Sequence, residues 1–188
     1  MFICYKETAE NGDRTLDSVL AQDVYDALIG KGYRVFFSRI TLEDKLGVEY
    51  EPYIFAALHS AKIMLAFGTD YEYFNAVWVK NEWSRFLKLM ANDNTKRLIP
   101  CYKGIDAYDM PKEFARLQAQ DLGKVGAMQD LLRGIEKVLP PKEDVTKKIA
   151  KSGAVHPSAL DIRSCESGHI LQNIVPSIIH TKSDEKLM

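Results

Sequence analysis

The sequence has few cysteines, and none of them has the spacing of a metal site. Cys4, Cys101 and Cys165 are odd in number and far apart, and no CxxC motif occurs. This pattern favours a reducing cytoplasm and indicates neither a disulfide framework nor a zinc site. The four histidines also lack the spacing of metal ligands, so we expect no bound metal and no cofactor.

The sequence also lacks a long apolar run and an excess of one charge. Its most apolar run, AKIMLAFG, is far too short to span a bilayer, and its first residues turn polar too early for a signal peptide. With 25 basic and 26 acidic residues the net charge is −1, which gives no general affinity for nucleic acid or an anionic membrane. No GxGxxG or Walker-type loop occurs. We therefore expect a cytoplasmic protein that binds neither nucleic acid nor membrane.

Short apolar runs alternate with amphipathic stretches over the first 140 residues. The runs predict buried strands at residues 2–5, 33–38, 62–68 and 97–102, the last interrupted at Pro100. The stretches predict helices from Thr15 to Gly30, after Glu51, from about residue 78 to residue 90, and over 127–139. Residues 39–50 and 69–77 are expected to be irregular, and 110–122 fits either a short helix or a strand. In the first helix the predicted apolar face consists of Leu16, Val19, Leu20, Val24 and Leu28.

This alternation predicts an α/β fold, a mostly parallel central sheet with helices on both faces. Ligands in such sheets bind at the carboxyl ends of the strands, where the loops after Tyr5, Ser38 and Gly68 meet. Residues 1–140 are expected to form this domain. Residues 141–188 are polar and broken by Gly and Pro, and we interpret them as a linker or tail.

Glu51 is the first candidate for chemistry. It stands three, four and seven residues before Ile54, Phe55 and Leu58, which puts a carboxylate at the head of an apolar helix face. Pro52 is favoured in the first helical turn, so Glu51 is expected at or beside the N-cap. Its carboxylate either only balances the helix dipole or has a function.

Two further groups of residues have the same ambiguity. Trp78 and Glu82 lie four apart on one side of a helix, and Glu82 is either a structural carboxylate or part of a site. The charged loop after Phe37 is either a solvated turn or a surface that contacts a partner. It contains Arg39 and then Ile40, Thr41, Leu42, Glu43, Asp44, Lys45, Leu46 and Gly47.

Four segments in order carry a family resemblance. They are FICYKE, GYRVFFSRITLEDKLG, EPYIFAALHSAKIMLAFGTDYE and WVKNEWSRFL. Over about residues 1 to 140 the chain resembles a Toll/interleukin-1 receptor (TIR) domain of bacterial type. Cys4 stands where the family's F-I-S-Y motif has serine, the loop with Gly47 corresponds to its BB loop, and WVKNE corresponds to its W-x-x-x-E helix.

The resemblance implies a flavodoxin-like three-layer fold and one of two functions. Some family members cleave NAD⁺ at the nicotinamide–ribose bond, as hydrolases or as cyclases that form cyclic ADP-ribose, often in antiviral defence. In those members one glutamate is essential, and Glu51 is assigned to it, with Glu49 as the fallback. NAD⁺ is then the substrate, and the remaining substrate-binding candidates are Tyr5, Lys6, Phe37, Ser38, Arg39, Trp78 and Glu82.

The resemblance also leaves a second function open. Other members are non-catalytic scaffolds, or mimics of host adaptors, which assemble through TIR–TIR contacts. In either case self-association is expected, with residues 40–47 as the assembly loop. A response-regulator receiver is disfavoured, because Lys6–Glu7 stands where receivers carry an acidic pair.

Overall fold

The structure is a computed structural model that describes residues 1–141. The predicted tail, apart from Pro141, lies outside the described residues. In the described part, no helix is long and apolar enough to cross a bilayer.

Four parallel strands form the central sheet, in the order β1–β2–β3–β4. Their bounds are β1 Phe2–Cys4, β2 Ile63–Gly68, β3 Arg97–Tyr102 and β4 Gln120–Asp121. Every residue of β1 and β2 is buried, as expected for parallel strands covered on both faces. The predicted α/β fold with a parallel sheet is thereby confirmed.

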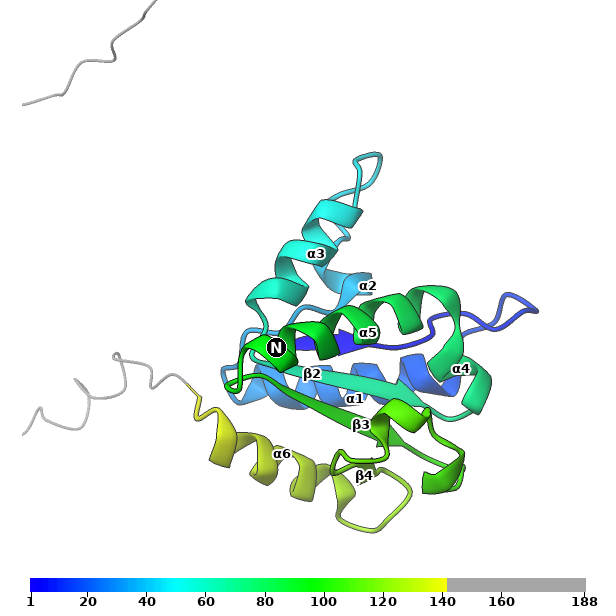
Figure 1. Ribbon diagram of the computed structural model, residues 1–188. Coiled ribbons are helices and arrows are strands. Elements are labelled where there is room, and N and C mark those ends of the chain that lie inside the picture. The colour runs from blue at the N-terminus through cyan, green and yellow to red at the C-terminus, as the bar shows by residue number, and fades with distance from the viewer. Residues whose placement is uncertain (142–188) are drawn as a thin grey trace, which may run out of the picture. The chain divides into compact units, whose positions relative to one another are not determined.

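Helices cover both faces of the sheet and make three layers. On one face α1 (Leu16–Gly30) and α6 (Ala127–Val138) pack on Ile3, Leu65 and Phe67. On the other face α3 (Glu51–Ser60), α4 (Tyr71–Asn75) and α5 (Val77–Asn92) pack on the alternate strand residues. Figure 1 shows α5 and α6 on opposite sides of the strands, and α3 rising away from the sheet.

The strand predicted at residues 33–38 is wrong. Only Phe36 forms a bridge, to Phe2 at the edge of the sheet, through backbone hydrogen bonds to Met1 and Ile3. The chain then turns at once into the short helix α2 (Ser38–Thr41), because the Thr41 hydroxyl accepts from the Phe37 amide. The first residues of the predicted charged loop are therefore helical.

The face predicted for α1 is also wrong in part. Leu16 and Val19 are 46% and 44% exposed, while Asp17 and Ser18 are fully buried. Thr15 caps the helix by accepting from the Ser18 amide, and the Asp17 carboxylate accepts from the Thr69 amide at 2.7 Å. These polar contacts rotate the start of the helix away from the orientation that would bury its apolar side chains.

Three connections differ from or refine the sequence prediction. Residues 69–77 are not irregular but contain α4, whose Phe74 ring packs so closely on Gly68 that a Cβ there would lie 2.2 Å from it. Pro100 does not interrupt β3, because β4 pairs only from Cys101 onward and the missing amide is not needed. The ambiguous segment contains both a 3₁₀ turn (Lys112–Phe114) and β4.

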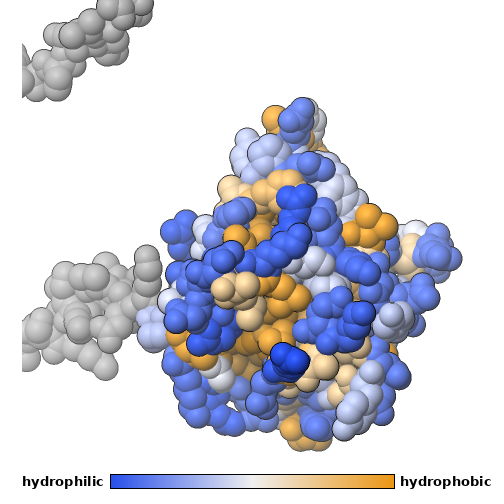
Figure 2. Space-filling view, viewed as in Figure 1, coloured by the Kyte–Doolittle hydropathy of each residue, from blue (hydrophilic) through white to orange (hydrophobic). Residues whose placement is uncertain are grey.

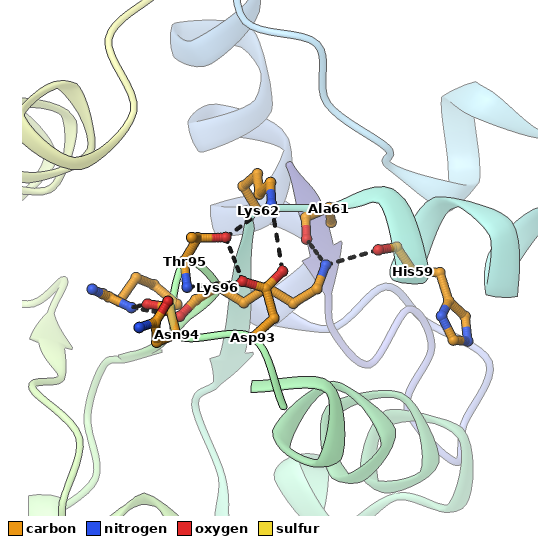
Figure 3. Close-up of polar contacts among 8 residues, drawn as sticks. His59, Ala61, Lys62, Asp93, Asn94, Thr95 and Lys96 are labelled. Atoms are coloured by element: carbon orange, nitrogen blue, oxygen red, sulfur yellow. Dashed lines mark hydrogen bonds and ion pairs between the residues drawn. The ribbon is translucent and has the colours of Figure 1, made fainter. Parts of the chain in front are cut away.

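A buried lysine holds α3 at the amino ends of the strands. Lys96 is 7% exposed, and its ammonium donates to the main-chain oxygens of His59 at 2.7 Å and Ala61 at 2.6 Å (Figure 3). Nearby, the exposed Lys62 contacts Asp93 at 3.4 Å and Thr95 at 2.8 Å. Lys96 thus satisfies carbonyl groups that the end of a helix leaves without partners.

An apolar groove lies on the surface between α5 and α6. Figure 2 shows apolar side chains gathered there, in a hollow over β3. The groove has a volume of about 430 Å³, and its walls include Met90, Leu98, Leu117 and Leu131.

Candidate functional site

A cleft of about 600 Å³ opens at the carboxyl end of β1. The loop after β1, α2, the start of α3, α4 and the first turns of α5 form its walls. This is the edge of the sheet at which the sequence predicts a ligand. Of the predicted substrate-binding residues, it brings together Tyr5, Lys6, Ser38, Trp78 and Glu82.

Glu82 lies at the inner wall of the cleft. Val79, Trp83 and Phe86 bury one face of α5, and the Trp83 indole donates to the Phe74 carbonyl at 2.8 Å, which fixes the helix. Glu82, between them in sequence, is largely covered and still borders the cleft. Burial raises the pKa of Glu82 to about 7, and a hydrogen bond from Cys4 opposes this effect. A carboxyl group with such a pKa in a cleft is typical of functional sites.

Two aromatic side chains stand at the mouth of the cleft. The rings of Trp78 and Tyr50 are 6.2 Å apart at an angle of 59°, and each side chain is about half exposed. Trp78 comes one helical turn before Glu82, so a flat ring that contacts the indole lies close to the carboxylate. The sequence pattern did not indicate Tyr50, because it precedes the helix and belongs to no apolar stripe.

A group of hydroxyls and charges lines the side of the cleft that follows β1. The Tyr5 hydroxyl is 3.4 Å from the Ser38 hydroxyl, and burial raises the pKa of Tyr5 above its ordinary value. Glu7 also borders the cleft, paired with Arg14 at 3.7 Å. Among the described residues of the lining, Lys6 is the one cation. A phosphate in this cleft would therefore be drawn to Lys6.

Two predicted substrate-binding residues lie outside the cleft. Phe37 is fully buried, and its ring stacks on Tyr5 at 5.0 Å and Tyr25 at 5.1 Å, so it cannot stack on a ligand. Arg39 points to α1, where its guanidinium donates to Gln22 and lies over the Phe37 ring. These positions follow from α2, which turns the chain away from the extended path that the sequence predicts.

Glu51 and Glu49 are exposed and do not line the cleft. Glu51 is the first residue of α3, after Tyr50 at the N-cap and before Pro52. Because α3 begins far from the sheet (Figure 1), its first turn lies at the outer end of the helix. The carboxylate is thus placed where it favours the helix dipole.

The predicted assembly loop, residues 40–47, stands beside the cleft mouth. Leu42 lines the cleft, Lys45 pairs with Asp44 at 2.5 Å, and Gly47 has a φ of 80°. Leu46 is 89% exposed, and Val48 just beyond the loop is 52% exposed. Exposed apolar side chains on a projecting loop are typical of a surface that contacts a partner.

Comparison with known proteins gives one family. Residues 1–138 match the sequence model described as TIR domain. No curated protein matches the chain. Among residues 1–141, no three or more His, Cys, Asp or Glu side chains lie together in a way that could hold a metal ion.

Proposed function

Because the chain belongs to the TIR domain family, which includes NAD⁺-cleaving enzymes and scaffolds, we propose that it cleaves NAD⁺ at the nicotinamide–ribose bond. The observation that carries this proposal is Glu82, a largely covered carboxyl group with a raised pKa at the inner wall of the cleft. A structural carboxylate in this position would need a strong donor, and within residues 1–141 the Cys4 thiol is the one group that acts to lower the pKa of Glu82.

The proposed reaction needs little more than a fixed negative charge. The ribose C–N bond breaks, its electron pair passes to the nicotinamide ring, and neutral nicotinamide leaves. The ribosyl group then has the character of an oxocarbenium ion, as in glycoside hydrolysis, and the ionised Glu82 stabilises it. Attack by water, with loss of a proton, gives ADP-ribose, whereas attack by a nitrogen of the same molecule gives a cyclic product.

Other residues of the cleft support this assignment. Trp78 and Tyr50 present two aromatic rings at the mouth, where the nicotinamide or adenine ring can stack. Lys6 supplies a positive charge for the diphosphate, and the Tyr5 and Ser38 hydroxyls offer hydrogen bonds to ribose. We further propose, from the family alone, a role in bacterial antiviral defence in the cytoplasm.

The geometry favours Glu82 over Glu51 as the essential glutamate. Glu51 is exposed and outside the cleft lining, so its charge is screened by water. Glu82 is largely covered, so its charge acts more strongly on a bound cation. The assignment of Glu51 remains a prediction of the sequence, and both residues can be tested in parallel.

The second candidate function is a non-catalytic scaffold. The exposed Leu46 and Val48 beside the cleft favour it, because a scaffold needs a surface that binds a partner and does not need catalytic activity. A scaffold would leave NAD⁺ intact while it self-associates.

The deciding experiment follows NAD⁺ consumption and resolves the products by mass. Wild-type protein is compared at high concentration with Glu82→Gln, Glu51→Gln and Glu49→Gln, each of which keeps the shape of the side chain. We expect nicotinamide release by the wild type, a loss of about 10²- to 10³-fold in Glu82→Gln, and near wild-type rates in the other two. The mass of the second product separates hydrolase from cyclase.

Each contrary result has a defined meaning. Loss of turnover in Glu51→Gln with turnover retained in Glu82→Gln would restore the sequence-based assignment. Absence of nicotinamide release from wild-type protein that has been shown to self-associate would favour the scaffold.

A further inference from the structure

A carboxylate oxygen without a partner lies in the wall of the cleft. Glu7 follows β1 and lines the cleft. Its Oε1 faces the Arg14 Nε at 3.7 Å, which is longer than a hydrogen bond. Its Oε2 is buried and has no hydrogen-bond partner among residues 1–141. A buried acceptor without a partner lowers stability, so a donor supplied by a ligand would be favourable at this point.

The main chain around Glu7 is held in place, while its side chain keeps some freedom. The Glu7 carbonyl accepts from the Thr15 amide at 3.0 Å, and Thr8 and Arg14 pair in an antiparallel bridge. These contacts close a loop that extends beyond the end of β1 (Figure 1). The Glu7 side chain is 38% exposed. Its carboxylate can therefore turn towards a donor in the cleft without a change in the backbone.

A purely structural role, in which Glu7 anchors Arg14, explains less. The Arg14 guanidinium has its own partners, because it donates to the Ser18 hydroxyl at 3.2 Å and to the Ser18 carbonyl at 3.3 Å. The side chains of Glu7 and Arg14 are both partly exposed, and such pairs contribute little to stability. The ion pair therefore leaves the place of the Glu7 carboxylate in the cleft wall without an explanation.

The described lining of the cleft carries more negative than positive charge. Its one cation is Lys6, and its carboxylates are those of Glu7, Glu10, Glu72 and Glu82. A dinucleotide with a positive nicotinamide ring and a single negative diphosphate is compatible with this set. A further phosphate on the adenosine ribose would add about −1.5 to −2 charges at pH 7 and would meet carboxylates instead of a second cation.

We propose that Glu7 determines substrate specificity: its carboxylate accepts a hydrogen bond from a hydroxyl of the adenosine ribose and excludes dinucleotides with a 2′-phosphate there. The inference rests on the proposed function for the class of substrate. A carboxylate that binds the ribose 2′-hydroxyl makes the same selection in dinucleotide-binding folds of another kind. The cleft should thus accept NAD⁺ and reject NADP⁺.

The test measures binding without turnover. ADP-ribose and ADP-ribose 2′-phosphate are titrated separately into the full chain at one ionic strength, and calorimetry gives each Kd. We expect the wild type to bind ADP-ribose about 30-fold more tightly, and Glu7→Gln, which keeps the shape of the side chain, to narrow this ratio to about threefold. Arg14→Gln is the matched control. It removes the ion pair and leaves the carboxylate, so it should not narrow the ratio.

The outcomes separate this inference from the proposed function. Equal affinity of the wild type for the two ligands, binding of neither, or equal narrowing in Arg14→Gln and Glu7→Gln would overturn the inference, whether or not the protein cleaves NAD⁺. A preference for ADP-ribose that Glu7→Gln removes would support it, even if no nicotinamide is released. If the protein is an enzyme, kcat/KM for NAD⁺ should exceed that for NADP⁺ by a similar factor, and Glu7→Gln should reduce that factor.

Discussion

At the scale of single residues, Glu82 is expected to lower the stability of the fold at neutral pH. Its pKa in the folded protein is about 7, against an ordinary value of 4.5, so the folded state binds the proton more tightly. The contribution to stability is therefore fully present below pH 4.5 and is lost as the pH rises through 7. A functional site that needs a charged group in a covered position lowers the stability of the fold in this way.

Glu82→Gln should consequently stabilise the protein in a pH-dependent way. We expect a gain of about 1–3 kcal/mol in the free energy of unfolding at pH 8, and little gain at pH 4.5. Urea unfolding at the two pH values measures it. An equal gain at both would mean that Glu82 is not protonated more readily in the folded state.

The same carboxyl group predicts the pH dependence of catalysis. In the proposed reaction only the ionised form would stabilise the ribosyl cation, so kcat/KM should rise with pH through a pKa of about 7 and then level off. Between pH 6 and pH 8 the expected rise is about tenfold. Initial rates at low NAD⁺ concentration over pH 5 to 9 give this profile.

Asp17 supplies the control for that profile. Its carboxylate is buried, and burial raises its pKa to about 6, so it also titrates near neutrality. Asp17→Asn keeps an acceptor for the Thr69 amide and removes the charge. The rise of kcat/KM near pH 7 should persist in this variant. If the rise disappears, the titration belongs to Asp17.

At the scale of elements, a single lysine is expected to fix the end of α3. Lys96→Met removes the ammonium from the carbonyl oxygens of His59 and Ala61, while its apolar chain still packs beside the Phe86 ring. Leaving these oxygens without their partner should lower the free energy of unfolding by about 1–3 kcal/mol. The midpoint of urea unfolding reports the change.

Lys62→Met is the matched control for this prediction. Lys62 lies in the same cluster (Figure 3), but its side chain is exposed and, within residues 1–141, pairs only with Asp93 and Thr95. An exposed pair contributes little, so the change should stay within about 1 kcal/mol. Equal effects of the two variants would show that the burial of Lys96 has no special role.

The elements that could be predicted from the sequence are those defined by apolar pattern alone. The buried run at residues 62–68 and the stripe of Val79, Trp83 and Phe86 correspond to β2 and α5. The errors occur where polar contacts between distant segments determine the local structure. Asp17 turns the first turn of α1 inward through Thr69, 52 residues away, and Thr41 ends the extended segment at Phe37. No local pattern records such contacts.

The lining of the cleft could be predicted in part for the same reason, while the roles of its residues remain predictions. The carboxyl edge of the sheet follows from topology, so Tyr5, Lys6, Ser38, Trp78 and Glu82 could be placed there. Which glutamate is covered depends on how α3 and α5 pack against the sheet. Spacing puts Glu51 and Glu82 on equal terms, whereas the packing of α5 on the sheet leaves Glu82 partly covered and Glu51 stays exposed.

At the scale of the whole molecule, the exposed loop beside the cleft is expected to link activity to self-association. TIR domains self-associate, and Leu46, 89% exposed, projects from the loop whose Leu42 lines the cleft. A second copy that covers Leu46 would order this loop and exclude water from the cleft. Specific activity should therefore rise with protein concentration.

Leu46→Glu should weaken this assembly without unfolding the domain, because an exposed side chain contributes little to stability. We expect a loss of at least about tenfold in association affinity, since a charge would be buried at the contact, and a specific activity that no longer depends on concentration. Sedimentation velocity and NAD⁺ turnover over the same concentration series measure both. Val125→Glu, at a fully exposed valine in the loop before α6, is the control and should change neither. If Leu46→Glu associates like the wild type, the contact between copies lies elsewhere, and the cleft does not depend on this loop being covered.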